Sequence, residues 1–79
     1  MTLSPDDLNE LDQSVLDLLN EGRVTPTLAR ELLISRGIRE TVSRQYINQR
    51  LKRLEEHDHI VNLLETGVYE IRTDPREGN

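Results

Sequence analysis

Apolar residues recur along most of the chain at spacings of three and four, which is typical of amphipathic helices. A first helix is predicted over about residues 5–21, because Ser4 can cap it, Pro5 suits its first position and Gly22 can end it. Its apolar stripe consists of Leu8, Leu11, Val15, Leu18 and Leu19.

A second helix of about ten residues is predicted to begin at Pro26, where Thr25 repeats the signal of a cap followed by proline. It is expected to end near Arg36, because Gly37 readily adopts the left-handed conformation of a helix terminus. Between the two helices, Val24 is expected to dock into a sheet as a short extended piece. The expected core face of the second helix consists of Leu28, Ala29, Leu32 and Leu33.

A third helix is predicted over about residues 43–57, with Ser43 or Thr41 as its cap. The linker before it contains Ile38 and Val42, which we expect to turn inward. Its core stripe consists of Ile47, Leu51 and Leu54, and the opposite face is polar throughout.

The period of the pattern changes from 3.6 to two after Asp58. Alternating apolar residues predict two short strands, 60–63 and 68–72, and Gly67 in the turn between them indicates a hairpin. Residues 74–79 contain no apolar side chain, so we expect a disordered C-terminal tail there.

A length of 79 residues allows one small domain, which we place over residues 1–73. The predicted fold class is mainly α with a small β-hairpin. The absence of cysteine excludes disulfides and thiolate zinc ligands. Apolar runs are too short to span a membrane, and the first residues lack the pattern of a secretory signal, so a cytoplasmic protein without membrane contact is expected.

The charge is unevenly distributed. The net charge is -5, yet residues 36–53 contain six basic residues and one acidic residue, whereas residues 1–21 contain six acidic residues and no basic one. The chain is therefore predicted to be an acidic body with one basic stripe. Nine of the ten cations are arginine, and this balance resembles that of proteins from salt-loving microbes, whose surface carboxylates maintain solubility.

Three helices followed by a hairpin, with polar and basic residues on the third helix, resemble a winged helix-turn-helix. The stretch from Ser43 to Glu55, then Ile60-Val61 and Thr66–Ile71, resembles the recognition helix and wing of winged helix-turn-helix transcriptional regulators. The acidic, lysine-poor background is similar to that of small haloarchaeal phage phi-H repressor-like proteins. The resemblance covers about residues 5–72. It implies a regulator, most simply a repressor, that binds double-stranded DNA with the helix at 43–57.

The side chains of the third helix suit such a role. Amides can pair with adenine edges, and arginine or lysine can bind guanine or phosphate in the major groove. The resemblance implies that Ser43, Arg44, Gln45, Asn48 and Gln49 face the groove. The candidate DNA-binding set consists of Ser43, Arg44, Gln45, Asn48, Gln49, Arg50, Lys52, Arg53, Arg39 and Thr66.

Other interpretations remain open for the same residues. The polar face of the third helix can be a solvated surface, with its cations paired to Glu55 and Glu56. The wing departs from the resemblance, because Glu65 places an acid at its tip. His57 and His59 invite a metal-binding or pH-switch interpretation, but we expect no metal or other cofactor, since no third ligand has a suitable spacing.

We expect no enzyme and no small-molecule substrate, because neither a phosphate-binding glycine loop nor an activated nucleophile is present. One domain of this size covers about half an operator, which predicts a homodimer. Leu3, Leu16, Ile34 and Leu64 are the candidate contacts of that dimer. The alternative function is a winged-helix adaptor that binds proteins and never DNA. An RNA-binding role is less favoured, because aromatic platforms are lacking.

Overall fold

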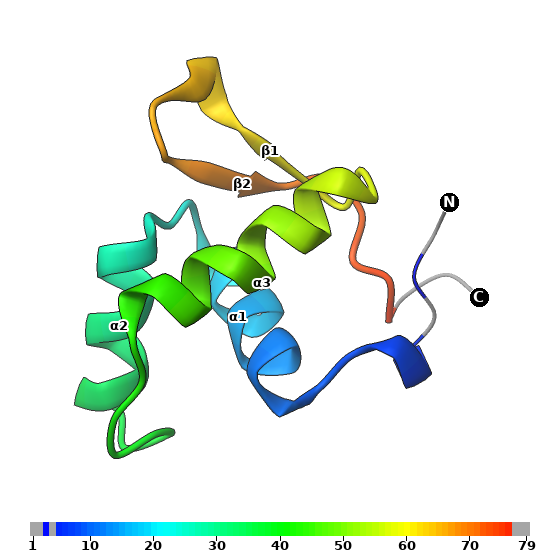
Figure 1. Cartoon of the computed structure of the whole chain (residues 1–79). Coiled ribbons are helices and arrows are strands. Elements are labelled where there is room, and N and C mark those ends of the chain that lie inside the picture. Colours follow the sequence, from blue (N-terminus) through cyan, green and yellow to red (C-terminus); the bar gives the residue numbers. More distant parts are fainter. Residues whose placement is uncertain (1–2, 4, 77–79) are drawn as a thin grey trace.

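The computed structural model describes residues 3 and 5–76. Three α-helices and one antiparallel hairpin make up the fold (Figure 1), which confirms the predicted mainly α class with a small β-hairpin. Short 3-10 turns precede the first helix and connect the two strands. The elements are the 3-10 turn Pro5–Asp7, α1 (Glu10–Glu21), α2 (Pro26–Ser35), α3 (Arg44–Glu56), β1 (Ile60–Asn62), the 3-10 turn Leu63–Glu65 and β2 (Tyr69–Ile71).

The start of α1 differs from the prediction. The helix begins after Asn9, whose side chain accepts from the backbone N–H of Asp12 while the Asp12 carboxylate accepts from the N–H of Asn9. This capping box satisfies two free donors at once, so it outcompetes the proline signal upstream. Pro5 therefore starts only a 3-10 turn, and the expected cap Ser4 lies outside the described residues.

The bounds of α2 and α3 confirm the predictions. The Thr25 hydroxyl accepts from the N–H of Leu28 at the start of α2, and the Ser43 hydroxyl accepts from the N–H of Tyr46 at the start of α3. After α2, Gly37 has a φ of 71°, the left-handed conformation expected of a terminator.

The hairpin is antiparallel, with Ile60 opposite Ile71 and Asn62 opposite Tyr69. Val24 forms an isolated bridge with Tyr69, through backbone hydrogen bonds of 2.7 and 3.0 Å. The expected docking of Val24 is thereby confirmed. Asp58 turns the chain from α3 into β1 with a φ of 63°, a conformation that aspartate tolerates better than most residues.

The core lies between the three helices and the base of the hairpin. The predicted stripe of α3 is buried, and Val42 turns inward as expected. Two expectations are wrong: Leu28 is 44% exposed and Ile38 is 49% exposed. Two of the proposed dimer contacts, Leu3 and Leu16, are buried, and Ile34 is partly buried against the core.

The predicted tail is wrong for residues 74–76, which pack against α1. Asp74 is buried, and its carboxylate accepts from the side-chain amide of Asn20 at 2.8 Å and from Arg76. Arg76 also donates to the Gln13 carbonyl and pairs with Asp17 at 2.9 Å. The segment is thus held by hydrogen bonds and ion pairs, which hydropathy does not show, and by the burial of Pro75. Residues 77–79 lie outside the described part of the chain.

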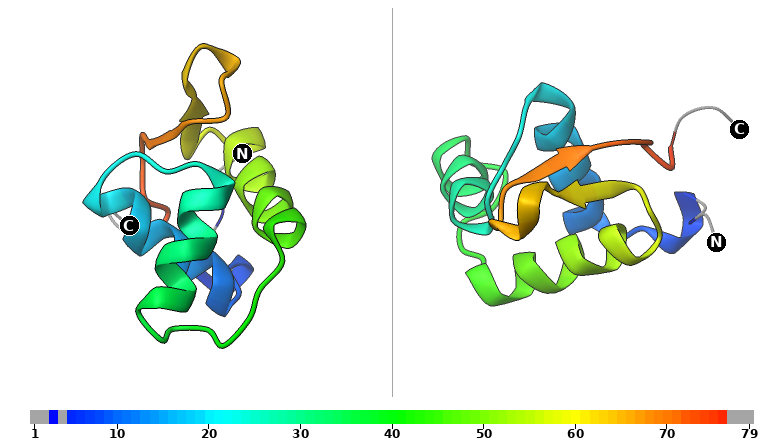
Figure 2. Two further views of the ribbon diagram at one scale, coloured as in Figure 1. Left: turned by 90° about the vertical axis from the view of Figure 1, so that its left-hand side faces the viewer. Right: turned by 90° about the horizontal axis from the view of Figure 1, so that it is seen from above.

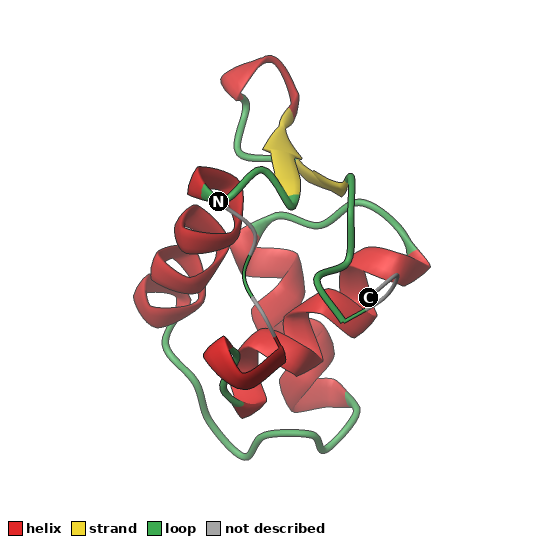
Figure 3. Cartoon of the chain, turned by 90° about the vertical axis from the view of Figure 1, so that its right-hand side faces the viewer, coloured by secondary structure: helices red, strands yellow, loops and turns green. Residues whose placement is uncertain are grey.

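The arrangement leaves one side of α3 uncovered. Seen from above, α3 runs along an outer edge of the molecule, with α1 behind it and the hairpin over its C-terminal end (Figure 2). The hairpin projects beyond the helices, and both ends of the described chain lie on the side away from α2 (Figures 1 and 3).

Candidate nucleic-acid interface

The uncovered side of α3 carries a row of polar side chains, which we call the outer row. It lies opposite the core residues of the helix, of which Ile47 and Leu51 are fully buried. Four of its members are exposed and Asn48 is half-buried. The outer row consists of Arg44, Gln45, Asn48, Gln49 and Lys52.

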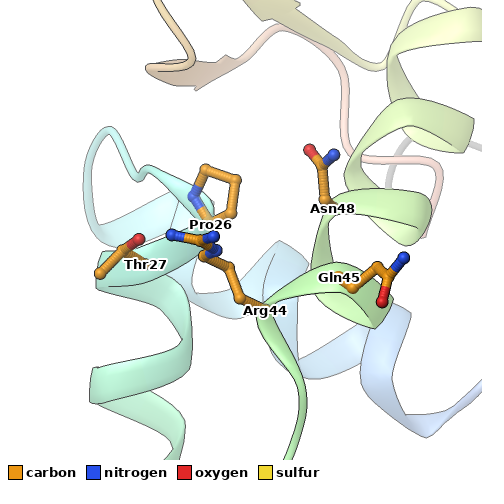
Figure 4. Close-up of a pocket in the computed structure, with 5 residues that line it drawn as sticks. All are labelled: Pro26, Thr27, Arg44, Gln45 and Asn48. Atoms are coloured by element: carbon orange, nitrogen blue, oxygen red, sulfur yellow. The ribbon is translucent and has the colours of Figure 1, made fainter.

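A groove adjoins the first half of the outer row. Its volume is about 620 Å³, and its walls come from the start of α2 and the first turns of α3. Arg44 extends from α3 toward the start of α2, and Asn48 projects from the next turn (Figure 4). The lining residues are Pro26, Thr27, Arg44, Gln45 and Asn48. The groove therefore brings three of the predicted site residues together.

A second stripe of α3 is hydrogen-bonded to residues at and just before the start of α1. The Arg50 guanidinium donates to both carboxylate oxygens of Asp12, through Nε at 2.7 Å and through Nη2, and Asp12 is buried. Hydrogen bonding to Asp12 raises the pKa of Arg50. Arg53 donates to the Asp7 carbonyl at 2.8 Å, and its Nη1 lies 3.7 Å from Asp12. These two predicted site residues therefore tie α3 to the start of α1.

The position of Asp12 in the sequence gives one indication of its pairing with Arg50, which the overall composition does not reveal. Asp12 falls in phase with Leu8, Val15 and Leu19, so the helical period places a carboxylate on the core-facing stripe of α1. A buried carboxylate needs a hydrogen-bonded cationic partner. The partner is 38 residues away in the chain, and only the packing of α1 on α3 identifies it as Arg50.

Two further candidates act in local structure. The Ser43 hydroxyl caps α3, and the Thr66 hydroxyl donates to the Leu63 carbonyl at 2.7 Å inside the hairpin turn. Arg39 lies in the linker before α3 and is half-buried. The structure thus places Ser43 at the end of the outer row, and Arg39 and Thr66 on other segments.

The cations divide into two groups within the described residues. Six arginines form ion pairs with acids of the chain: Arg23, Arg30, Arg36, Arg50, Arg53 and Arg76. The other four, Arg39, Arg44, Lys52 and Arg72, form no side-chain hydrogen bond or ion pair with the described residues. Two of these four belong to the outer row, in a protein where acids outnumber bases by 15 to 10.

The hairpin tip has an unusual conformation that hydropathy does not reveal. Leu64 and Glu65 have φ angles of 50° and 54°, in the left-handed region that side chains with a Cβ rarely adopt. Leu64 is 94% exposed. The turn is held by hydrogen bonds from the N–H of Thr66 to the Leu63 carbonyl and from the N–H of Gly67 to the Asn62 side chain.

The histidine pair has a structural explanation. His59 is buried, and its Nε2 accepts from the N–H of Leu3 at 3.1 Å. Its Nδ1 must then carry the proton and donates to the Thr73 carbonyl at 2.9 Å. His59 therefore joins the two ends of the described chain. Within residues 3 and 5–76, no three potential metal-ligating side chains gather at one place.

The two tyrosines have different environments. Tyr69 is buried in the core, and burial raises its pKa. Tyr46 is marginally exposed on α3. Its hydroxyl accepts from the Asn9 side chain at 3.1 Å, which adds a further link between α3 and the start of α1.

No helix in the described part of the chain is long and apolar enough to cross a membrane. Comparisons with models of known families, with curated proteins and with solved structures found no match for this chain.

Proposed function

We propose that this protein is a sequence-specific regulator that binds double-stranded DNA. In this proposal α2 and α3 act as a helix-turn-helix, the hairpin β1–β2 acts as the wing, and α3 enters the major groove. The protein would act as a repressor, because occupancy of an operator needs no further domain or activity. Two copies would bind two half-sites as a homodimer.

The observation that most supports the proposal is the outer row of α3. A DNA reader needs donors and acceptors on the exposed face of a helix and an apolar anchor on the other face. Here the anchor is buried, while Arg44 and Lys52 remain without an acidic partner among the described residues. Elsewhere on the surface, Arg23 and Arg36 are paired with acids of the chain.

The overall charge makes short-range contacts decisive. A net charge of -5 repels a polyanion at long range, so steering toward DNA is weak. Binding must then depend on hydrogen bonds and ion pairs formed at contact. High salt weakens phosphate contacts, with a slope of about -0.9 in log K against log salt for each phosphate neutralised.

Titration of labelled random-sequence duplexes across a range of salt concentrations tests the proposal. We expect binding at low salt with a negative salt slope. Arg44→Gln should make that slope shallower by about 0.9 if Arg44 contacts one phosphate. Arg23→Gln is the matched control, because Arg23 is also exposed but pairs with Glu70 at 3.0 Å. Absence of any duplex binding at low salt would contradict the proposal.

A protein-interaction adaptor is the second candidate function. It is favoured by the net charge of -5 and by Leu64, which presents an almost fully exposed apolar side chain at the hairpin tip. An adaptor should fail to bind duplexes at every salt concentration, so the same titration distinguishes the two functions.

A further inference from the structure

The outer row of α3 contains three amides, and their state in the structure bears on which bases they would read. Gln45, Asn48 and Gln49 form no side-chain hydrogen bond with the described residues. Asparagines elsewhere are engaged: Asn9 caps α1, and Asn20 donates to the Leu16 carbonyl and to Asp74. The three amides therefore keep a full set of donors and acceptors for a partner.

The spacing of these amides matches neighbouring base pairs. Gln45 and Gln49 are one helical turn apart, a rise of about 6 Å along α3. Successive base pairs are separated by about 3.4 Å. The amides thus span roughly two base steps on one face of the helix.

The arginine in the middle of α3, the type of side chain best suited to guanine, is already hydrogen-bonded within the protein. An arginine fork binds guanine O6 and N7, whereas an amide binds adenine through one donor and one acceptor. Arg50 stands next to Gln49 in sequence, but its fork is occupied by buried Asp12. Arg53 is held by the Asp7 carbonyl. The cations that remain free on α3, Arg44 and Lys52, flank the amides on either side.

We infer that the centre of each half-site consists of adjacent A·T pairs whose adenines are read by these amides, with Arg44 and Lys52 on flanking positions. This inference rests on the proposed DNA-binding function. It follows from the withdrawal of Arg50, which sequence alone leaves available for guanine.

Selection of duplexes from a random pool with the full-length chain tests it first. The expected result is enrichment of at least two adjacent A·T pairs at the centre of the half-site. Enrichment of G·C pairs there, or binding without base preference, would overturn the inference while leaving DNA binding intact. No binding to the pool at low salt would instead overturn the proposed function, and the inference with it.

Two further measurements separate reading of adenine from a general preference for A·T-rich DNA. Replacing the central adenines by 7-deazaadenine removes the N7 acceptor, and affinity should fall about tenfold. Gln49→Glu leaves only acceptors on that side chain and should shift the preference at one position from adenine to cytosine. Gln13→Glu, an exposed residue of α1 with the same change of charge, is the control and should leave the preference unchanged.

An unchanged affinity for the 7-deazaadenine duplex would refute bidentate reading of adenine. So would a Gln49→Glu variant that loses affinity equally for every sequence in the pool.

Discussion

Asp74 is a buried carboxylate that accepts several hydrogen bonds near the C-terminal end of the described residues. Its carboxylate accepts from the Arg76 side chain, from the Arg76 backbone N–H and from Asn20. These bonds, chiefly that from the Arg76 side chain, lower the pKa of Asp74 to about 2. The charged form is therefore favoured in the folded protein and less so in the unfolded chain.

The free energy of unfolding should therefore depend on the ionisation of Asp74 at acidic pH. Because the pKa of Asp74 is lower in the folded protein than in the unfolded chain, its contribution to the free energy of unfolding is complete above about pH 4. This contribution is lost as the pH falls through about 2. The shift corresponds to roughly 2 kcal/mol of unfolding free energy. Urea denaturation between pH 2 and pH 5 measures it. Asp74→Asn should remove this part of the acid dependence, whereas the exposed control Asp6→Asn should retain it.

Leu64 is the second informative residue, because its backbone is strained and its side chain buries nothing. A left-handed residue with a Cβ costs about 1–2 kcal/mol, and asparagine tolerates this conformation better than leucine. We expect Leu64→Asn to raise the free energy of unfolding by up to about 1 kcal/mol, as measured by urea denaturation. A loss of stability would show that the Leu64 side chain has a folding role that its 94% exposure hides.

The elements are joined by polar contacts as well as by the core. One stripe of α3, consisting of Tyr46, Arg50 and Arg53, is hydrogen-bonded along the segment Asp7–Asp12. Asp12 is the centre of this contact, because it caps α1 and binds Arg50 at the same time. The orientation of the outer row thus depends on a carboxylate in another helix.

Removal of that carboxylate should be costly. Asp12→Ala leaves the half-buried Arg50 without its partner and breaks the capping box, so a loss of about 3–5 kcal/mol is expected. Chemical denaturation followed by circular dichroism measures the loss. Glu70→Ala, which breaks the exposed pair with Arg23, should cost less than about 1 kcal/mol. Similar losses in the two variants would show that burial of the Asp12 pair is unimportant.

At the scale of the molecule, Arg44 and Lys52, which are unpaired among the described residues, lie on the uncovered side of α3. Six of the nine arginines are paired with acids of the chain, and two of the four cations without a partner among the described residues, Arg44 and Lys52, lie in the outer row of α3. This side of α3 is also the face that the hairpin flanks and that neither α1 nor α2 covers (Figure 2). In the proposed function, this face would bind one half of a two-fold DNA site.

The proposed homodimer makes a geometric prediction. Two half-sites should bind two chains most tightly when their centres are about 10 base pairs apart, so that both face the same side of the duplex. Sedimentation of the complexes should show two chains on such a duplex. Insertion of about five base pairs should abolish the cooperativity, because the half-sites then face opposite sides. Equal binding at both spacings would contradict a dimer, whose contacts cannot include buried Leu3 and Leu16.

Features that depend on residues close together in the chain could be predicted from the sequence. Thr25-Pro26 and Ser43 define the starts of α2 and α3, since a cap bonds to an N–H three residues along the chain. The buried stripe of α3 follows equally from the helical period. The candidate polar face is predictable for the same reason, because fixing the buried side of a helix also fixes its exposed side.

Which polar residues of α3 are already bonded within the protein depends on how the helices pack. Arg50 and Gln49 are adjacent in sequence, yet one is bound to Asp12 in α1 and the other has no partner among the described residues. The packing of Asp74 against α1 is likewise absent from the local pattern. Hydropathy describes the transfer of a single side chain out of water, so it can be assigned to each residue without knowledge of its partners. An ion pair depends on two groups that meet only when the helices have packed.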